Sequence, residues 1–238
     1  MGRAFEVRKA SMMKTGAAKA KLYSKFGKEI YMAAKNGGPN IEANTELKRL
    51  IERAKKNQVP GDVIARNIDK ATSNAVDNYT FYRYEGFGPG GAQLIVDCLS
   101  DNVNRTVTEV RNCFTKTDGK LGVNGSVIHG FDHLAVVSVA NVEEEDLLDA
   151  LFTQDIDIDD VETEAEMTTI YAAAEQLHKV TQIIQDSFSE AELLHEEQTY
   201  LAQTLITLNE GEASAFEKLL NMLEDCEDVQ RVYHNVKA

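Results

Sequence analysis

The hydrophobic pattern of this 238-residue chain changes its period near residue 78. Before that point, apolar residues recur at every third or fourth position, which is the spacing of an amphipathic helix. After it, runs rich in aromatic and β-branched residues alternate with further helical segments. The order predicts a helical unit followed by α+β modules.

Three helices are predicted in the first segment. The first spans residues 17–35 and ends at the Asn-Gly-Gly-Pro run of residues 36–39. The second spans residues 45–57 with Asn44 as its N-cap, and a shorter third helix follows Pro60. Helical spacing gives each one an apolar face, formed by Leu22, Phe26, Ile30 and Ala33, by Leu47, Leu50, Ile51 and Ala54, and by Val63, Ile64, Ile68 and Ala71.

Charge is divided by position along the chain. Residues 1–70 hold 16 Lys and Arg against 7 Asp and Glu, whereas the rest holds 9 against 32, so a net charge of +9 precedes one of −23. A basic surface attracts polyphosphate and an acidic one repels it, so the division predicts a protein that binds nucleic acid at one end. The alternative is that the charged residues only form ordinary solvent-exposed helix faces and bind no partner.

The cations of the first two helices are expected opposite the apolar faces, except that Lys48 and Lys55 flank the cationic face of the second helix. On a helical wheel, the lysines of the first helix cluster within about 80° of one another, well away from its apolar stripe. The predicted nucleic-acid-binding residues are Lys21, Lys25, Lys28 and Lys35 on the first helix and Arg49, Arg53, Lys55 and Lys56 on the second. One phosphate contact each from Lys21, Lys25, Lys28, Arg49, Arg53 and Lys56 would give a salt slope of about −5 on duplex DNA.

A basic lead-in precedes these helices and is expected to order on a phosphate backbone. It contains Arg3, Arg8, Lys9, Lys14 and Lys19. Lysines mainly position a protein on phosphates, and the chain has no helix-turn-helix or zinc-finger signature. Sequence specificity is therefore not predicted.

After residue 78 the chain is predicted to form two α/β modules of the split βαβ kind. Strands are expected over residues 79–84, 92–100, 199–208 and 229–236, extended segments over 125–132 and 134–139, a hairpin over 161–172, and helices over 102–116, 143–154, 175–187 and 212–225. We predict three domains: a basic helical domain at 1–75, an α/β domain at 79–131 plus 204–238, and an acidic α/β domain at 132–203 inserted into it.

The run Gly86-Phe87-Gly88-Pro89-Gly90-Gly91 matches the letters of a dinucleotide-binding glycine motif. A dinucleotide site requires a strand before the motif and a helix after it, whereas a strand-like run follows here. The motif is therefore interpreted as a tight loop before a strand, whose exposed backbone amides could meet a partner.

The remaining motifs favour neither catalysis nor a cofactor. The spacing of Asp155, Asp157, Asp159 and Glu166 imitates a calcium loop, but Asp160 stands where the sharp turn needs glycine. No nucleophile elbow, P-loop lysine or metalloprotease helix is present. We predict a protein with no catalytic residue, metal, cofactor or small-molecule substrate.

Cys98, Cys113 and Cys226 are odd in number and widely spaced, which argues against a disulfide framework and a zinc knuckle. No apolar run has the length of a membrane span or of a secretory signal. The expected location is the cytoplasm, with no membrane partner.

Several segments of the chain, taken together and in order, are similar to the YebC/PmpR family, especially its shorter YeeN-like branch. They are KLYSKFGKEIY at residues 21–31, NTELKRLIERA at 44–54, QVP at 58–60, YEGFGP at 84–89, NVNRT at 102–106 and GS at 125–126. The resemblance implies a helical first domain, two α/β domains and a cytoplasmic non-enzymatic regulator that binds DNA. Mitochondrial relatives act as translational activators and bacterial members have been tied to the ribosome, so RNA or the ribosome is the alternative partner.

One departure from the family concerns the basic lead-in. Many relatives carry a Trp-Ala-Asn-Ile run there, whereas this chain has Ala4-Phe5-Glu6-Val7 and no Trp. The site prediction therefore stays with the helix cations. Some residues match the family although they have no evident role in a hydrophobic core, and these are second-tier binding candidates. They are Gly86, Phe87, Gly88, Asn104 and Arg105.

Overall fold

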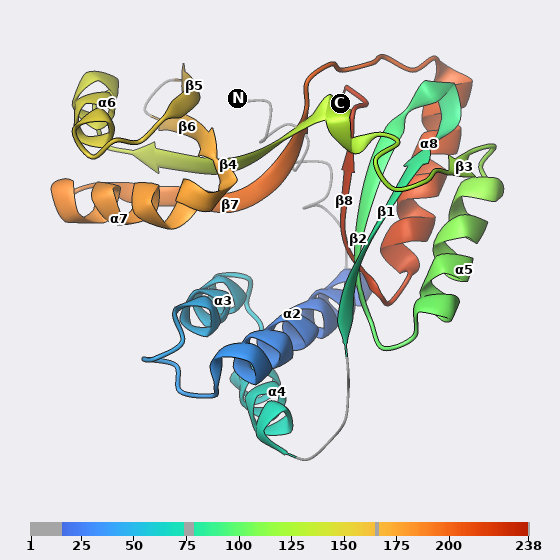
Figure 1. The fold of residues 1–238 in the computed structure, drawn as a ribbon, viewed down its shortest axis with the longest axis horizontal. Helices are drawn as coiled ribbons and strands as arrows, with labels where there is room; N and C mark the ends of the chain where they lie inside the picture. Colours follow the sequence, from blue (N-terminus) through green and yellow to red (C-terminus); the bar gives the residue numbers. More distant parts are fainter. Residues whose placement is uncertain (1–15, 74–78, 165–166, 238) are drawn as a thin grey trace. The chain divides into compact units, whose positions relative to one another are not determined.

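The computed structural model describes residues 16–73, 79–164 and 167–237. In these residues the chain forms seven α-helices and two four-stranded sheets, which confirms the predicted α+β class (Figure 1). The basic lead-in at Arg3, Arg8, Lys9 and Lys14 lies outside the described residues, and so does the run at residues 4–7. The three-domain boundaries given above stay a prediction.

The described residues divide into two compact units. One contains Gly125–Leu208 and the residues from Tyr233, and the other contains the described residues up to Asn124 together with Asn209–Val232. Each unit is described below by itself.

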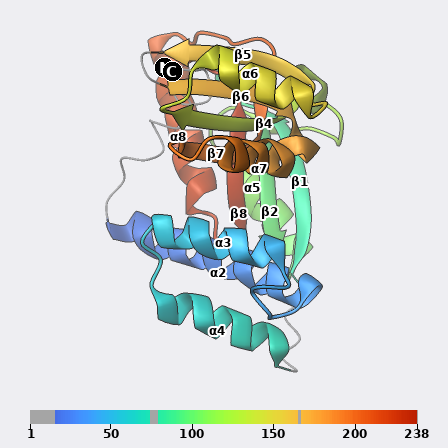
Figure 2. The ribbon, with the colours of Figure 1, turned by 90° about the vertical axis from the view of Figure 1, so that its left-hand side faces the viewer.

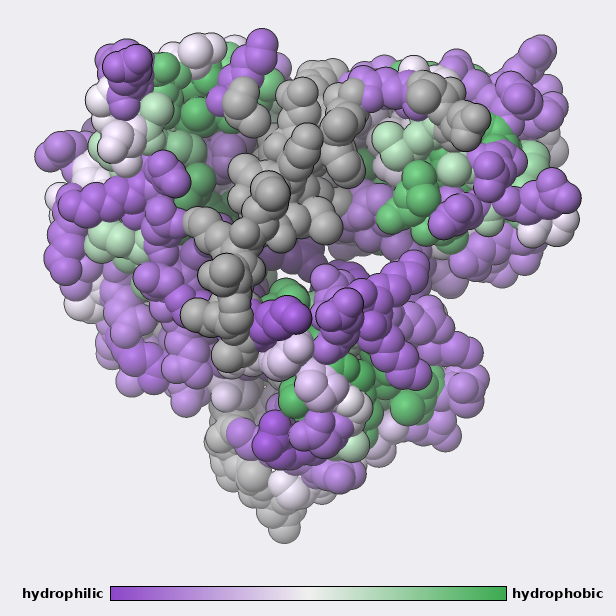
Figure 3. Space-filling model, turned by 180° about the vertical axis from the view of Figure 1, so that it is seen from behind, coloured by the Kyte–Doolittle hydropathy of each residue, from purple (hydrophilic) through white to green (hydrophobic). Residues whose placement is uncertain are grey.

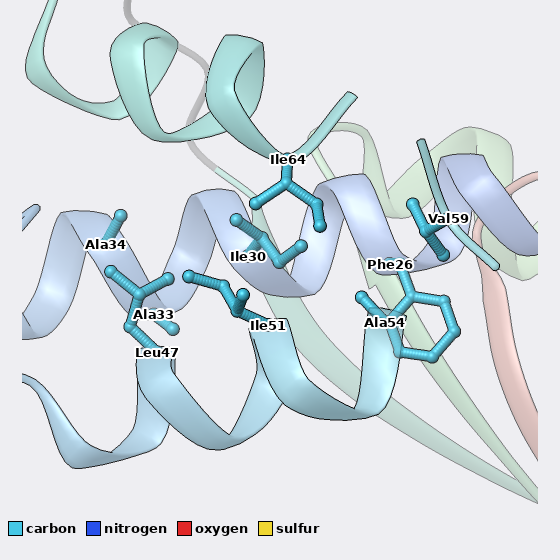
Figure 4. Close-up of a cluster of buried hydrophobic side chains, with 9 residues drawn as sticks. All are labelled: Phe26, Ile30, Ala33, Ala34, Leu47, Ile51, Ala54, Val59 and Ile64. Carbon is cyan, nitrogen blue, oxygen red and sulfur yellow. The ribbon is translucent and has the colours of Figure 1, made fainter. Parts of the chain in front are cut away.

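The second unit begins with the three predicted helices, α2 (Gly16–Gly37), α3 (Thr45–Lys56) and α4 (Gly61–Thr72). In both side views, α2 lies between α3 and α4 (Figures 1 and 2). The apolar faces meet in one core (Figure 4), formed by Phe26, Ile30, Ala33 and Ala34 of α2, Leu47, Ile51 and Ala54 of α3, Val59, and Ile64 of α4. The helical periodicity therefore located this core correctly.

Asn44 caps α3, as predicted, and also secures the end of α2. Its Oδ1 accepts a hydrogen bond from the Leu47 amide at 3.0 Å, which satisfies one of the free N–H groups of the first turn. Its Nδ2 donates to the carbonyl oxygens of Ala33 at 2.9 Å and of Gly38 at 2.8 Å. These three hydrogen bonds join the start of α3 to the end of α2 through one buried side chain.

A sheet with strand order β3-β1-β2-β8 completes the second unit. Its strands are β1 (Thr80–Phe87), β2 (Gln93–Ser100), β3 (Lys120–Leu121) and β8 (Val229–His234). Helices α5 (Val103–Thr115) and α8 (Glu210–Asp225) lie side by side along one face of it (Figure 1). Phe114 of α5 and Leu219 of α8 supply buried side chains to this layer.

The other unit is a sheet covered by two helices. Its strands β4 (Phe131–Ala140), β5 (Ile158–Glu164), β6 (Met167–Ala173) and β7 (Glu192–Ala202) have the order β5-β6-β4-β7, and neighbouring strands are antiparallel. Helices α6 (Glu144–Thr153) and α7 (Leu177–Ser187) pack on one face. The core between them contains Val137 and Val139 of β4, Leu147 and Leu151 of α6, Ile170 and Ala172 of β6, and Val180 and Ile184 of α7.

Three local predictions were wrong. Strand β7 runs over Glu192–Ala202 and not over residues 199–208, because its polar first half, residues 192–197, pairs with residues 136–140 of β4. Part of the segment expected to be extended at 125–132 forms a 3₁₀ turn at Ile128–Gly130. The two-residue strand β3, which the pattern did not predict, pairs with Gly86 and Phe87 of β1.

Candidate nucleic-acid interface

Three lysines on the polar face of α2 contact the acidic segment of the same unit, which we define as residues 225–230, from the end of α8 into β8. Lys21 forms an ion pair with Asp225. The Nζ atom of Lys25 donates to the Gln230 carbonyl oxygen at 3.3 Å. Lys28 donates to Asp228 Oδ1 at 3.0 Å and to the Glu227 carbonyl oxygen at 3.1 Å. The chain's own anionic segment therefore binds three of the eight predicted cations.

These contacts remove the α2 lysines from solvent to different degrees. The Lys28 side chain is 8% exposed and that of Lys21 is 46% exposed. Burial lowers the pKa of Lys25, because it disfavours the charged form, although the nearby carboxylates of Glu224 and Glu29 oppose the change. The acidic part of the chain was expected to repel polyphosphate, and it also attracts particular lysines of the basic part. A phosphate contact by these three lysines stays a prediction that requires the acidic segment to release them.

Asp228 is the centre of this contact. Its Oδ1 accepts from Lys28, and its Oδ2 accepts from Ser100 at 2.9 Å, Thr106 at 2.8 Å and Arg105 at 2.8 Å. Burial opposes ionisation of the 1%-exposed side chain, but the donated hydrogen bonds outweigh it and lower the pKa of Asp228 to about 2. Elements α2, β2, α5 and the start of β8 therefore meet at one carboxylate.

Sequence reasoning did not identify Asp228. No local motif marks it, because each of its four partners lies more than 100 positions away. In the sequence it is only the last of four carboxylates within residues 224–228, and nothing local distinguishes it from the other three.

The second-tier candidates Asn104 and Arg105 lie exposed in the first turn of α5. Asn102 caps this helix by accepting from the Arg105 amide at 3.1 Å. One guanidinium nitrogen of Arg105 donates to Asp228 at 2.8 Å and to Asp101 at 2.9 Å, and these hydrogen bonds raise its pKa. Arg105 thus has a structural partner, and 44% of its side chain stays exposed.

Helix α3 presents the most accessible of the predicted cations. Lys55 and Lys56 are exposed, and neither forms an ion pair with any residue that the structure describes. Arg49 is half-buried. Arg53 is paired with Glu29 and its guanidinium lies 5.5 Å from the ring centroid of Phe26. Arg49, Arg53 and Lys56 lie on the side of α3 away from its buried residues, whereas Lys55 flanks the buried face, one turn after Ile51.

A second pair of exposed lysines lies at the junction of α2 and α4. The Nζ atoms of Lys35 and Lys70 stand 5.4 Å and 5.8 Å from the ring centroid of the buried Tyr31, which favours a cation. Lys35 was predicted from the helical wheel, whereas Lys70 was missed because the third helix was examined only for its apolar face. Hydrophilic residues cover most of the helical segment in the lower part of Figure 3.

The first half of the glycine loop is packed inside the unit, whereas Gly90 and Gly91 are exposed. A Cβ added at Gly86 would lie 2.6 Å from the Phe114 ring, and one at Gly88 would lie 3.0 Å from both Leu219 and Leu94. The Gly88 amide donates to the Ala92 carbonyl oxygen at 2.7 Å. Close packing therefore explains why Gly86 and Gly88 are glycines. The prediction that the loop exposes its backbone amides is wrong for these two residues, because both are buried. Phe87 is half-buried, with the Lys120 Nζ atom 5.5 Å from its ring centroid.

Two family models match the chain. The TACO1/YebC protein N-terminal domain matches residues 3–74, and the TACO1/YebC second and third domain matches residues 79–236. The chain belongs to the TACO1/YebC family. The resemblance inferred from the separate sequence segments is thereby confirmed.

Relatives in the TACO1/YebC family align over almost their full length. A probable transcriptional regulatory protein of Alteromonas mediterranea is 50% identical over 235 residues, covering 99% of this chain and 98% of the relative. One of Pseudoalteromonas atlantica is 51% identical over 235 residues, covering 99% and 97%. The crystal structure of a conserved hypothetical protein, Aq1575 from Aquifex aeolicus, is similar with a TM-score of 0.77 and 34% identity, covering 94% of this chain and 92% of that one.

Among the residues that the structure describes, no helix is long and apolar enough to cross a lipid bilayer.

Proposed function

We propose that this protein is a regulator of gene expression that binds nucleic acid through the cationic face of α3. The observation that carries the proposal is the exposure of two lysines of that helix: Lys56 lies beside Arg49 opposite the buried face, and Lys55 flanks that face. The names of the relatives, probable transcriptional regulatory proteins, support a regulatory role. The protein acts by binding, in the cytoplasm, without catalysis.

Duplex DNA is the first proposed target, and RNA, including RNA in the ribosome, is the alternative. Both present closely spaced phosphates, and lysines recognise phosphates without reading bases. The face of α3 has two lysines and two arginines but no Asn or Gln that could make paired hydrogen bonds to a base edge. Binding is therefore expected to depend on charge more than on base sequence.

The experiment compares two double variants that change the charge equally. Lys55→Gln/Lys56→Gln removes the exposed lysines of α3, whereas Lys116→Gln/Lys218→Gln removes two exposed lysines at α5 and α8. Affinity for a labelled 30-base-pair duplex is measured by fluorescence anisotropy at 100 mM salt. We expect the α3 variant to bind at least about tenfold more weakly, because two counterion-releasing contacts are lost, and the control to bind like the wild type.

The same titration with a single-stranded RNA and with purified ribosomes distinguishes the two targets. Tighter binding of RNA that is equally sensitive to the α3 substitutions would assign the face to RNA. If both double variants lose the same affinity for every probe, α3 has no special role and the proposal fails.

A further inference from the structure

Two of the three cysteines face each other inside the second unit. Cys113 lies in the last turn of α5 and Cys226 is the C-cap residue of α8. Their Sγ atoms are 3.6 Å apart, although the residues are separated by 113 positions in the chain. A disulfide needs a separation of about 2.05 Å, so a closing movement of about 1.5 Å would join them.

The surroundings of the pair differ from those of the third cysteine. Cys113 is 4% exposed and Cys226 is half-buried, so solvent reaches the pair from the Cys226 side. The hydrogen bond from Cys226 lowers the pKa of Cys113 and so favours its thiolate, although burial opposes this. Cys98 is fully buried, and burial raises its pKa to about 12. Cys98 is therefore an inert thiol in the same molecule.

We propose that Cys113 and Cys226 are a redox-active dithiol that a peroxide converts to a reversible disulfide. The Cys113 thiolate attacks one oxygen of hydrogen peroxide, the O–O bond breaks, and the departing hydroxide takes up the proton that Cys113 released. The Cys226 sulfur then attacks the resulting sulfenic acid, the S–O bond breaks, and the second hydroxide leaves with the Cys226 proton as water. Two thiols and one peroxide thus give one disulfide and two waters.

The disulfide would connect two elements that hold the acidic segment. It would tie α5 to the C-terminal end of α8, two residues before Asp228, the carboxylate that binds Lys28 and Arg105. Closing so long a loop restricts the unfolded chain, so the oxidised form should unfold at a higher temperature, by about 5 °C or more.

The test uses the full-length wild-type protein treated with a small excess of hydrogen peroxide in native buffer. We expect the free-thiol count to fall from three to one. A non-reducing tryptic map should show the peptide of residues 112–116 joined to that of residues 219–231, with the loss of two hydrogen atoms, and dithiothreitol should separate them. The Cys98→Ala variant should behave identically, whereas Cys113→Ala and Cys226→Ala should form no internal crosslink.

Several results would overturn the proposal. They are three free thiols after treatment, a crosslink that includes Cys98, and a crosslink that forms no faster in native buffer than in urea. Because the wild-type map is decisive by itself, a variant that fails to fold does not obscure the outcome.

Discussion

Asp228 shows how much one side chain can determine in this protein. Its carboxylate accepts hydrogen bonds from a lysine, an arginine and two hydroxyl groups that come from three different elements. A buried ion pair of this kind adds little over a well-packed apolar pair, but removing one partner leaves the other charge without compensation. The importance of Asp228 is therefore that the neighbouring groups cannot be satisfied without it.

Substituting Asp228 should strongly destabilise the second unit. Asp228→Asn leaves the buried Lys28 ammonium with only the exposed Glu227 carboxylate, 3.9 Å away, as counter-charge, so we expect the free energy of unfolding to fall by about 3 kcal/mol in urea denaturation. The matched control is Asp225→Asn, whose side chain is 71% exposed. It should cost less than about 1 kcal/mol, because exposed ion pairs contribute little. Equal losses in both variants would contradict the assigned role of Asp228.

The same carboxylate predicts a loss of stability in acid. The folded-state pKa of Asp228, about 2, lies below the ordinary value near 4, so the unfolded chain binds the proton more tightly. The stabilisation is complete above about pH 4 and is lost as pH falls towards 2, by about 2 kcal/mol in total. Urea titrations between pH 5 and 2 should show this component in the wild type, and Asp228→Asn should lack it.

Gly86 is predicted to be required for close packing. Gly86→Ala would place a methyl group 2.6 Å from the Phe114 ring and 3.0 Å from the Lys120 carbonyl oxygen. We expect a loss of about 1–3 kcal/mol in the free energy of unfolding, because the backbone carbonyl cannot move freely. Gly61→Ala is the control, since nothing lies within 4 Å of its added Cβ, and it should be neutral or slightly stabilising. If Gly86→Ala left the free energy of unfolding unchanged, close packing would not explain the glycine at this position, and contact with a binding partner would explain it better.

At the scale of the elements, two asparagine side chains hold the ends of helices. Asn44 caps α3 and also binds two carbonyl groups at the end of α2. Asn209 forms a capping box with Glu212 at the start of α8, but it is exposed. The two asparagines have the same capping role in different surroundings.

The two caps should therefore differ in their contribution to stability. Asn209→Ala should cost about 1 kcal/mol, the usual value for a cap. Asn44→Ala should cost at least about 2 kcal/mol, because it also leaves buried carbonyl groups without a donor. Thermal unfolding followed by circular dichroism measures both, and a smaller loss for Asn44→Ala would show that water replaces its hydrogen bonds.

The elements also show the limit of local pattern. Helices α3, α5 and α8 were predicted within two residues of their ends, because apolar spacing and caps are local properties. Strand β7 was misplaced because Glu192–Gln198 has the composition of a helix and becomes extended only by pairing with β4.

For the whole molecule, neither the net charge of −14 nor its division along the chain shows which cations are accessible to a partner. Lys21, Lys25 and Lys28 meet acidic or carbonyl groups about 200 positions away, while the cations of α3 remain at the surface. The number of cations available to a polyanion is therefore smaller than the number in the sequence.

The salt dependence of DNA binding measures that number. Contacts from Arg49, Arg53, Lys55 and Lys56 alone predict that the logarithm of affinity falls with the logarithm of salt at a slope of about −4 on duplex DNA. Participation of the three α2 lysines would steepen the slope to about −6. We expect the shallower value in titrations from 50 to 300 mM salt. The steeper one would mean that the acidic segment releases α2 on binding, and a flat response would reject phosphate contact.

The sequence alone determined the α+β class, the apolar faces of the first three helices, the Asn44 cap and membership of the family. Each of these depends on residues within a few positions of one another or on similarity along the whole chain. Only the tertiary structure decided which lysines are buried, why Gly86 and Gly88 are glycines and that Cys113 faces Cys226. These properties depend on pairs more than 25 positions apart, and a helical wheel places a cation on a face without showing what covers that face.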